Sequence, residues 1–146
     1  MDNKNITLNL RFAGIKVSKY SQYDLEEEFK KDEKPLVEFQ SNFQFKVLEN
    51  EEKVACLVTV KIVMIETREE FAELQVENIF EIKPFKDLII SKADNGFNIP
   101  DAVLHNLVSL SISTVRGILS EKLKGTIAQN EIYPLINPAT IFKKEQ

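Results

Sequence analysis

The sequence contains few side chains that could act together as an acid and a base, because its 146 residues include a single histidine, His105. Asp101 lies about one helical turn before it, and a carboxylate next to an imidazole can serve general acid–base catalysis. Asp101 suits a helix start equally well, since a carboxylate there complements the helix dipole, and His105 can lie on a polar or contact face. We favour this structural interpretation.

The remaining candidate groups also have structural explanations. Cys56 is the only cysteine and lies in an apolar run, so we expect a buried thiol without a disulfide. The sequence contains no glycine-rich phosphate loop, metal-ligand spacing or nucleophile motif. We therefore expect no enzymatic activity, no metal and no cofactor. Neighbouring glutamates fall in predicted turns or connections, where solvation explains them: Glu26 to Glu28, Glu51 and Glu52, and Glu69 and Glu70.

The composition is that of a soluble globular protein, with 43% hydrophobic and 29% charged residues. A chain of this length predicts a single domain, residues 1–146. The net charge of -4 argues against binding to nucleic-acid phosphates. The first ten residues lack the features of a signal peptide, and no continuous apolar stretch reaches membrane-spanning length. We expect a cytoplasmic protein without membrane insertion.

A long helix is predicted to begin at Pro100 and to end at Gly125. Between these two residues the apolar side chains recur at helical spacing, and a helix to Lys124 would be about 37 Å long. Ser109, Ser113 and Gly117 then form a row of small residues on one side of the helix. Two interpretations remain open, namely a neighbouring strand or side chain that fills this row, and close helix–helix contact between subunits.

Four strands precede this helix. Apolar residues alternate with polar ones from Ile6 to Phe12, and the alternation changes parity after Gly14, which predicts a β-bulge. Residues 37–47, 54–65 and 72–82 supply three more strands joined by short turns, whereas an acidic connection, residues 24–34, separates them from the first. Strands followed by helices indicate an α+β fold with a four-stranded antiparallel sheet and a Greek-key-like crossover.

A second, short helix is predicted at the C-terminus. Asn137 is a good N-cap and Pro138 a good first residue for a helix over Ala139 to Lys144. Because so short a helix is marginal alone, Ile141 and Phe142 must pack against another part of the molecule.

The C-terminal half resembles the SecB family of bacterial protein-export chaperones. The resemblance rests on the order of three stretches: Asn98-Ile99-Pro100, LVSLSISTVRGIL at residues 107–119, and YPLINPATIF at residues 133–142. Pro35 and the pair Ile79-Phe80 also match. The resemblance implies the family's fold, which agrees with the one predicted above, and a homotetramer that is a dimer of dimers with the long helices between the sheets. Ser109, Ser113 and Gly117 would then lie at the oligomer interface.

The resemblance also implies a function, the ATP-independent holding of unfolded precursor proteins for delivery to the SecA motor. In the family, apolar grooves hold the client. Phe71 and Glu73 match the places at which the family docks SecA. SecB-like proteins also serve toxin–antitoxin systems, so an antitoxin is an alternative client. The residues that correspond to the client groove are Tyr23, Leu25, Phe29, Leu36, Ile136, Ile141 and Phe142.

Two functions from other classes remain as alternatives. A hot-dog-like acyl-ligand binder or thioesterase also joins a long helix to an antiparallel sheet, and Asp101 would be its candidate catalytic carboxylate. A purely structural adaptor would bind one folded partner and ignore unrelated unfolded chains.

Overall fold

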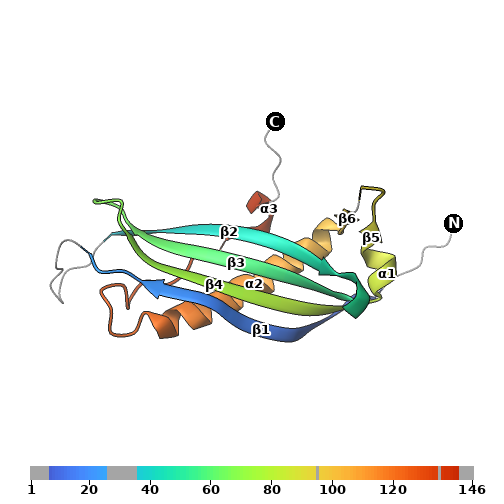
Figure 1. The fold of residues 1–146 in the computed structure, drawn as a ribbon, viewed down its shortest axis with the longest axis horizontal. Coiled ribbons are helices and arrows are strands. Elements are labelled where there is room, and N and C mark those ends of the chain that lie inside the picture. The colour runs from blue at the N-terminus through green and yellow to red at the C-terminus, as the bar shows by residue number, and fades with distance from the viewer. Residues whose placement is uncertain (1–6, 26–35, 95, 135, 142–146) are drawn as a thin grey trace.

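The computed structural model describes residues 7–25, 36–94, 96–134 and 136–141 (Figure 1). Four long strands precede one long helix, and short elements lie between and after them. In chain order the elements are β1 (Asn9–Gln22), β2 (Val37–Leu48), η1 (Glu49–Glu51), β3 (Lys53–Met64), β4 (Glu70–Lys83), α1 (Phe85–Leu88), β5 (Ile90–Ser91), β6 (Phe97–Asn98), α2 (Asp101–Lys122) and α3 (Pro138–Ile141).

The four long strands form one antiparallel sheet in the order β1-β4-β3-β2. β2, β3 and β4 are sequential neighbours, as expected for strands joined by short turns. β1 pairs with β4, so the chain passes from one edge of the sheet to the other between β1 and β2 (Figure 1). The predicted α+β class and the predicted crossover are confirmed.

β1 carries two bulges that keep its apolar residues on one face. The register with β4 shifts between Phe12 and Gly14, and again between Val17 and Lys19. The first shift confirms the predicted change of parity, and the second was not predicted. As a result, one row of β1 residues faces the buried row of β4: Leu10, Phe12, Ile15, Val17 and Tyr20 lie opposite Ile82, Phe80, Asn78, Val76 and Leu74.

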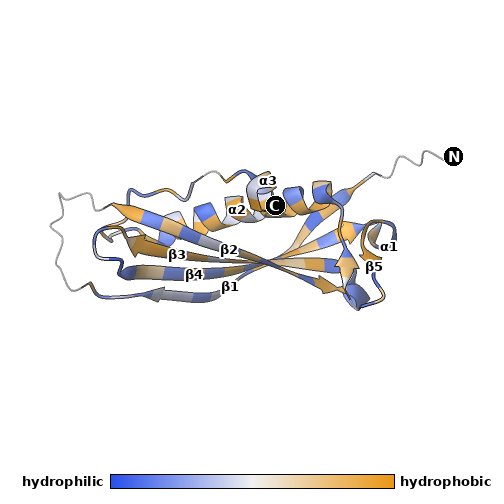
Figure 2. Ribbon diagram, turned by 90° about the horizontal axis from the view of Figure 1, so that it is seen from above, coloured by the Kyte–Doolittle hydropathy of each residue, from blue (hydrophilic) through white to orange (hydrophobic). Residues whose placement is uncertain are grey.

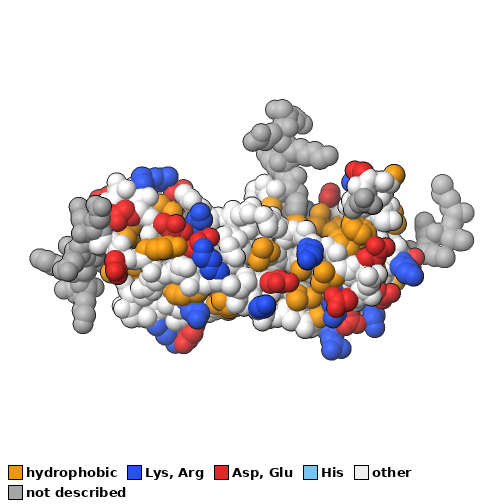
Figure 3. Space-filling view, in the orientation of Figure 1, with side chains coloured by type: hydrophobic (Ala, Val, Ile, Leu, Met, Phe, Trp, Pro, Cys, Tyr) orange, Lys and Arg blue, Asp and Glu red, His pale blue; other side chains and the backbone are white. Residues whose placement is uncertain are grey.

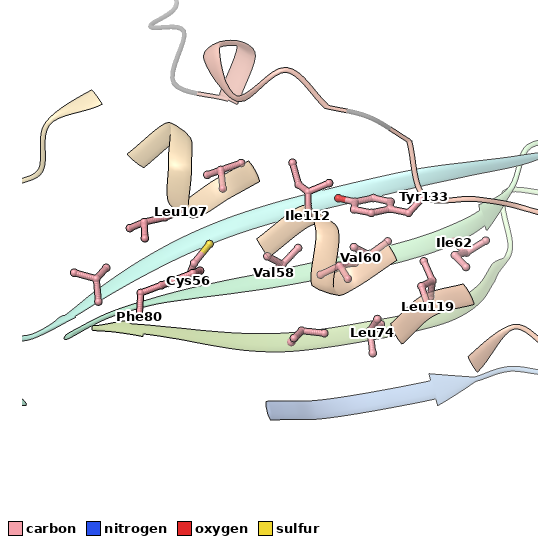
Figure 4. Close-up of a cluster of buried hydrophobic side chains, with 14 of the residues drawn as sticks. Cys56, Val58, Val60, Ile62, Leu74, Phe80, Leu107, Ile112, Leu119 and Tyr133 are labelled. Carbon is pink, nitrogen blue, oxygen red and sulfur yellow. The ribbon is translucent and has the colours of Figure 1, made fainter. Parts of the chain in front are cut away.

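α2 covers one face of the sheet, and the core lies between the two (Figures 2 and 4). Its sheet-facing residues are buried at helical spacing: Val103, Leu107, Val108, Ser111, Ile112, Val115 and Leu119. They pack on buried residues of β3 and β4 such as Val58, Val60 and Leu74. α2 is long and apolar enough to cross a membrane by length and composition, but a core helix passes the same test, and this helix packs on a sheet.

The ends of α2 lie close to the predicted ones. Pro100 immediately precedes the helix, and its carbonyl accepts the first helical hydrogen bond, from Leu104 N at 3.0 Å. The helix ends at Lys122, and Gly125 follows with a φ of 80°, the left-handed conformation that glycine adopts most readily.

The segment between β4 and α2 contains elements that were not predicted. α1 follows Pro84, and β5 and β6 form a two-stranded hairpin in which Ile90 pairs with Asn98 and Ser91 with Phe97. Strands of two residues are too short to show a periodicity in the sequence.

α3 begins where it was predicted to begin. Asn137 is its N-cap, because the Asn137 side-chain oxygen accepts a hydrogen bond from Ala139 N at 3.1 Å. Residues 142–144, the predicted end of this helix, lie outside the described residues.

Candidate protein-binding surfaces

The possible acid–base pair lies at the start of α2. Asp101 is exposed and His105 is partly exposed one turn further on. Glu51 and Glu52 are exposed beside η1, and Glu69 and Glu70 are partly exposed at the start of β4. Glu26 to Glu28 lie outside the described residues. Within the part of the chain that the structure describes, no group of three or more His, Cys, Asp or Glu side chains could hold a metal ion.

A small polar cluster lies inside the core, between the sheet and α2. Asn78 of β4 is fully buried, and its side-chain oxygen accepts a hydrogen bond from the Thr114 hydroxyl at 2.6 Å. The Asn78 amide in turn donates to the Cys56 carbonyl at 3.4 Å. Burial raises the pKa of the Cys56 thiol to about 11, although the Ser111 hydroxyl acts in the opposite direction. Cys56 is therefore a protonated, buried thiol, as predicted, and the cluster links α2 to two strands.

The segment between α2 and α3 lies along the side of α2 that faces β2, and we call its residues 126–134 and 136–137 the C-terminal strap (Figures 1 and 2). Tyr133 anchors it: this side chain is 2% exposed and lies between α2 and β2 (Figure 4). The Tyr133 hydroxyl forms a hydrogen bond with the Ser41 hydroxyl, and its ring packs edge-on against Phe39. The Arg116 Nε donates to the Tyr133 carbonyl at 3.0 Å. One side chain from α2 and two from β2 thus hold the strap.

Burial raises the pKa of the Tyr133 phenol, while the hydrogen bond with Ser41 and the charge of Arg116 oppose this change. The phenol is therefore neutral at physiological pH and can take part in the hydrogen bond with Ser41.

The structure separates the predicted client groove into two parts. Tyr23, Leu25 and Leu36 lie at the end of the sheet where β1 ends and β2 begins. Ile136 and Ile141 lie beside α2, close to α3, and both views place α3 near the middle of the molecule (Figures 1 and 2). The described members of the predicted groove therefore do not form one cluster. Phe29 and Phe142 lie outside the described residues.

The two parts also differ in exposure. Leu36 is 68% exposed and Tyr23 41% exposed, so both offer apolar surface at the sheet end. Leu25, Ile136 and Ile141 are partly buried and pack against the core. The sheet end therefore has more free apolar surface than the neighbourhood of α3.

Glu73, one of the two predicted SecA-docking residues, lies on the face of β4 that points away from α2, because it alternates with the buried Ala72 and Leu74. Phe71, the other one, falls at a register shift between β3 and β4 and belongs to the buried core cluster. The exposed fraction is 5% for Phe71 and 8% for Glu73. The Lys19 ammonium forms an ion pair with the Glu73 carboxylate at 2.6 Å.

The outer face of the sheet as a whole is of mixed character. Figure 3 shows lysine, arginine, aspartate and glutamate side chains interspersed with hydrophobic ones. Basic residues of β1 face acidic residues of β4: Arg11 is opposite Glu81 and Lys16 is opposite Glu77. A face with alternating charges does not form a basic surface for nucleic acid.

The predicted oligomer residues lie on the exposed side of α2. Ser109, Ser113 and Gly117 are all exposed, and a Cβ atom added at Gly117 would meet no described atom within 4 Å. Leu110 is 37% exposed on the same helix. Within the part of the chain that the structure describes, no strand or side chain therefore fills the small-residue row at Gly117.

Two features of the molecule were not predicted from the sequence. The first is a row of exposed apolar side chains on the edge strand β1, where Phe12, Ile15 and Val17 are 37%, 49% and 41% exposed. The alternation in the sequence predicted one buried face, but it could not show that α2 lies over β3 and β4 rather than over β1. The second is the role of Tyr133 as an anchor, and an aromatic residue before a proline in a polar loop was the available signal.

No protein-family model matches this sequence, and no curated protein matches it. Among solved structures, the chain is similar to the SecB-like chaperone Rv1957 of Mycobacterium tuberculosis, solved in complex with a ChAD peptide from the HigA1 antitoxin Rv1956. This likeness has a TM-score of 0.56 and 6% sequence identity, and it covers 86% of this chain and 83% of the other. The chain therefore has the α+β fold of a SecB-like protein.

A second similar structure is a protein of unknown function from Streptococcus agalactiae. Its TM-score is 0.44 with 17% identity, over 90% of this chain and 98% of that one.

Proposed function

We propose that this protein is a SecB-like chaperone that binds unfolded or incompletely folded proteins through exposed apolar surfaces, without nucleotide and without breaking or forming bonds. The observation that carries the proposal is apolar exposure on a SecB-like fold. Nine large hydrophobic side chains among the described residues are at least 37% exposed, and six of them lie in two groups, on β1 and at the sheet end: Phe12, Ile15, Val17, Tyr23, Leu36 and Ile65.

An antitoxin is the client that we favour, because the SecB-like chaperone of similar fold was solved with an antitoxin peptide. Export clients remain part of the proposal. We do not extend it to SecA docking through Phe71 and Glu73, since these nearly buried side chains offer little surface to a partner. The cytoplasm is the proposed location.

We propose that the chain assembles into a homotetramer. The exposed side of α2 and the free edge of β1 support this, since both carry apolar or small residues that a second copy could cover. Repeating a modest apolar surface in an oligomer increases the avidity for a long unfolded client.

Suppression of aggregation tests the holding function. Dithiothreitol releases the insulin B chain, which aggregates and scatters light, whereas this protein has one buried cysteine and no disulfide for the reductant to break. We expect suppression near stoichiometric amounts without nucleotide. Unchanged scattering at about a tenfold excess would contradict general holding and would direct the search to one dedicated partner.

A surface variant makes the test specific to the exposed side chains. Replacing Tyr23 and Leu36 together by serine should weaken suppression, because both are well exposed and their loss removes apolar contact area. The matched control replaces exposed polar residues of β2, Gln44 and Lys46, by serine. Equal suppression by both variants would exclude the sheet end as the client surface.

A further inference from the structure

The C-terminal strap packs between β2 and α2, where Phe39, Ser41 and Arg116 contact Tyr133 (Figure 4), and we call this place the strap groove. The strap residues 131–134 and 136–137 belong to no helix or strand, and buried and exposed positions alternate where Ile132 is 67% exposed and Tyr133 is 2% exposed. This is how an extended peptide lies in a groove, with one side chain inserted and the next in solvent.

The contacts that hold the strap depend little on its own sequence. Arg116 donates to two successive backbone carbonyls, those of Tyr133 and Pro134, at 3.0 and 3.4 Å. Any peptide can offer such carbonyls. The one selective element is the aromatic site formed by Phe39 and Ser41, which takes the Tyr133 ring and hydroxyl. The groove is therefore built for an extended segment that carries one aromatic residue.

The apolar floor of the groove continues along β2 beyond the anchor. Phe43 and Val47 lie on the same face of β2 as Phe39 and are only partly buried. A client with further apolar residues could use this floor as well as the aromatic site, and it would gain contact area that Tyr133 alone does not provide.

We propose that the C-terminal strap is an intramolecular competitor, which holds the groove until an extended client segment with an aromatic residue displaces Tyr133. The proposal rests on the chaperone function proposed above. A tethered segment acts at an effective concentration on the order of millimolar, so the strap excludes weak peptides and yields to clients that bind at several places.

A peptide added in trans tests this directly. The probe is a fluorescein-labelled peptide with the sequence of residues 126–141, and its anisotropy is measured with the full-length chain. We expect at least about a tenfold tighter binding to the Tyr133→Ser variant than to the unchanged chain, since the substitution empties the aromatic site. The matched control is Ile132→Ser, at the neighbouring exposed position, which should bind the peptide as weakly as the unchanged chain. Equal affinity of a folded Tyr133→Ser variant and the unchanged chain would overturn the proposal.

A second variant guards against a fold defect, because Tyr133 is buried. Tyr133→Phe keeps the buried ring and leaves every groove residue unchanged, but it removes the hydrogen bond between the strap and the Ser41 hydroxyl. The added peptide keeps its own tyrosine, so this variant should raise peptide affinity, though less than Tyr133→Ser does. If circular dichroism shows that Tyr133→Ser is unfolded, unchanged peptide affinity in Tyr133→Phe overturns the proposal.

The insulin assay on the same variants separates this inference from the chaperone function. In one outcome, the substitutions strengthen peptide binding but no variant suppresses aggregation. This result would support the strap as a competitor and would refute general holding. Suppression by the unchanged chain with no effect of either substitution on peptide affinity would refute the competitor and would leave the holding function standing.

Discussion

At the scale of single residues, Asn78 is the most constrained polar group in the core. Its side chain is fully buried and bonds both to the Thr114 hydroxyl and to the Cys56 carbonyl, so it joins β4 to α2 and to β3. An apolar core could bind α2 in several orientations, whereas a short hydrogen bond at 2.6 Å favours one of them. This cluster therefore favours the orientation of α2 that its buried residues also favour.

Removal of the hydrogen bond between Asn78 and Thr114 should lower the free energy of unfolding, and the effects of substitutions at these two residues should not add. Asn78→Ala leaves a small cavity and removes a hydrogen-bond partner from the Thr114 hydroxyl and from the Cys56 carbonyl. We therefore expect a loss of about 2 kcal/mol in the free energy of unfolding. Thr114→Val should cost about 1 kcal/mol, and the double variant less than the sum of the two. Urea unfolding of the four proteins measures this coupling. Gln75→Ala, on the outer face of β4, is the control, and simple additivity of the two core changes would show that the contact contributes nothing.

The sequence could predict which face a residue occupies better than how deeply it is buried. Glu73 lies on the outer face of β4, as the alternation of this strand indicates, whereas Phe71 falls at a register shift with β3 and belongs to the core cluster. The burial of Glu73 arises from residues distant in the sequence, such as Lys19, which reaches it across the sheet. No pattern within one strand contains that information.

At the scale of elements, α2 has two sides with different tasks. One side is buried on the sheet, and the other exposes Ser109, Ser113 and Gly117. Small exposed residues let another backbone approach closely, which a helix that faces only water does not need. This side of α2 is therefore the first place to test for contact between subunits.

Gly117→Leu should dissociate the assembly without harm to the single chain. A Cβ atom at this position meets no described neighbour within 4 Å, and the position is exposed, so we expect a leucine to be tolerated in the monomer but to clash in a close helix–helix contact. We expect a dissociation constant raised by at least about tenfold, seen as a lower molar mass in light scattering coupled to size exclusion. Gln44→Leu adds the same side chain to the outer face of β2 and should leave the mass unchanged. An unaltered mass for Gly117→Leu would remove α2 from the interface.

Elements with a long periodicity were predictable, and those without one were not. α2 and the four long strands each repeat their pattern over many residues, whereas β5 and β6 contain two residues each. The path of the C-terminal strap was not predictable for a related reason. It has no periodicity, and contacts with distant residues hold it, such as those of Tyr133 with Arg116 and Ser41.

At the scale of the whole molecule, the fold consists of two layers, with the core on one face of the sheet only (Figure 2). Cys56 lies in this core on β3, fully buried beneath α2. A reagent can reach it only if α2 separates from the sheet or the protein unfolds. The reactivity of this thiol therefore reports whether α2 has separated from the sheet.

The rate at which the Cys56 thiol reacts should depend on the separation of α2 from the sheet and on pH. The pKa of the thiol is raised from 9.0 to about 11, so the folded state favours the protonated form. The stability from this group is complete below pH 9.0 and is lost as the pH rises towards 11. At pH 8 we expect the native thiol to react with Ellman's reagent at least about a hundredfold more slowly than the urea-unfolded chain. Comparable rates would show that α2 does not cover the thiol in solution.

The two bulges of β1 affect how this chain can be aligned with others. The strand has 14 residues and faces the 12 residues from Ala72 to Lys83, and the two unmatched positions are Ala13 and Ser18. A chain that lacks either residue would keep every facing pair, because Phe12 and Gly14 already lie opposite adjacent residues of β4. A deletion at any other place within the paired strand would reverse the two faces on one side of the gap. Alignments that admit gaps only in loops would therefore misplace half of this strand, even between chains with the same fold.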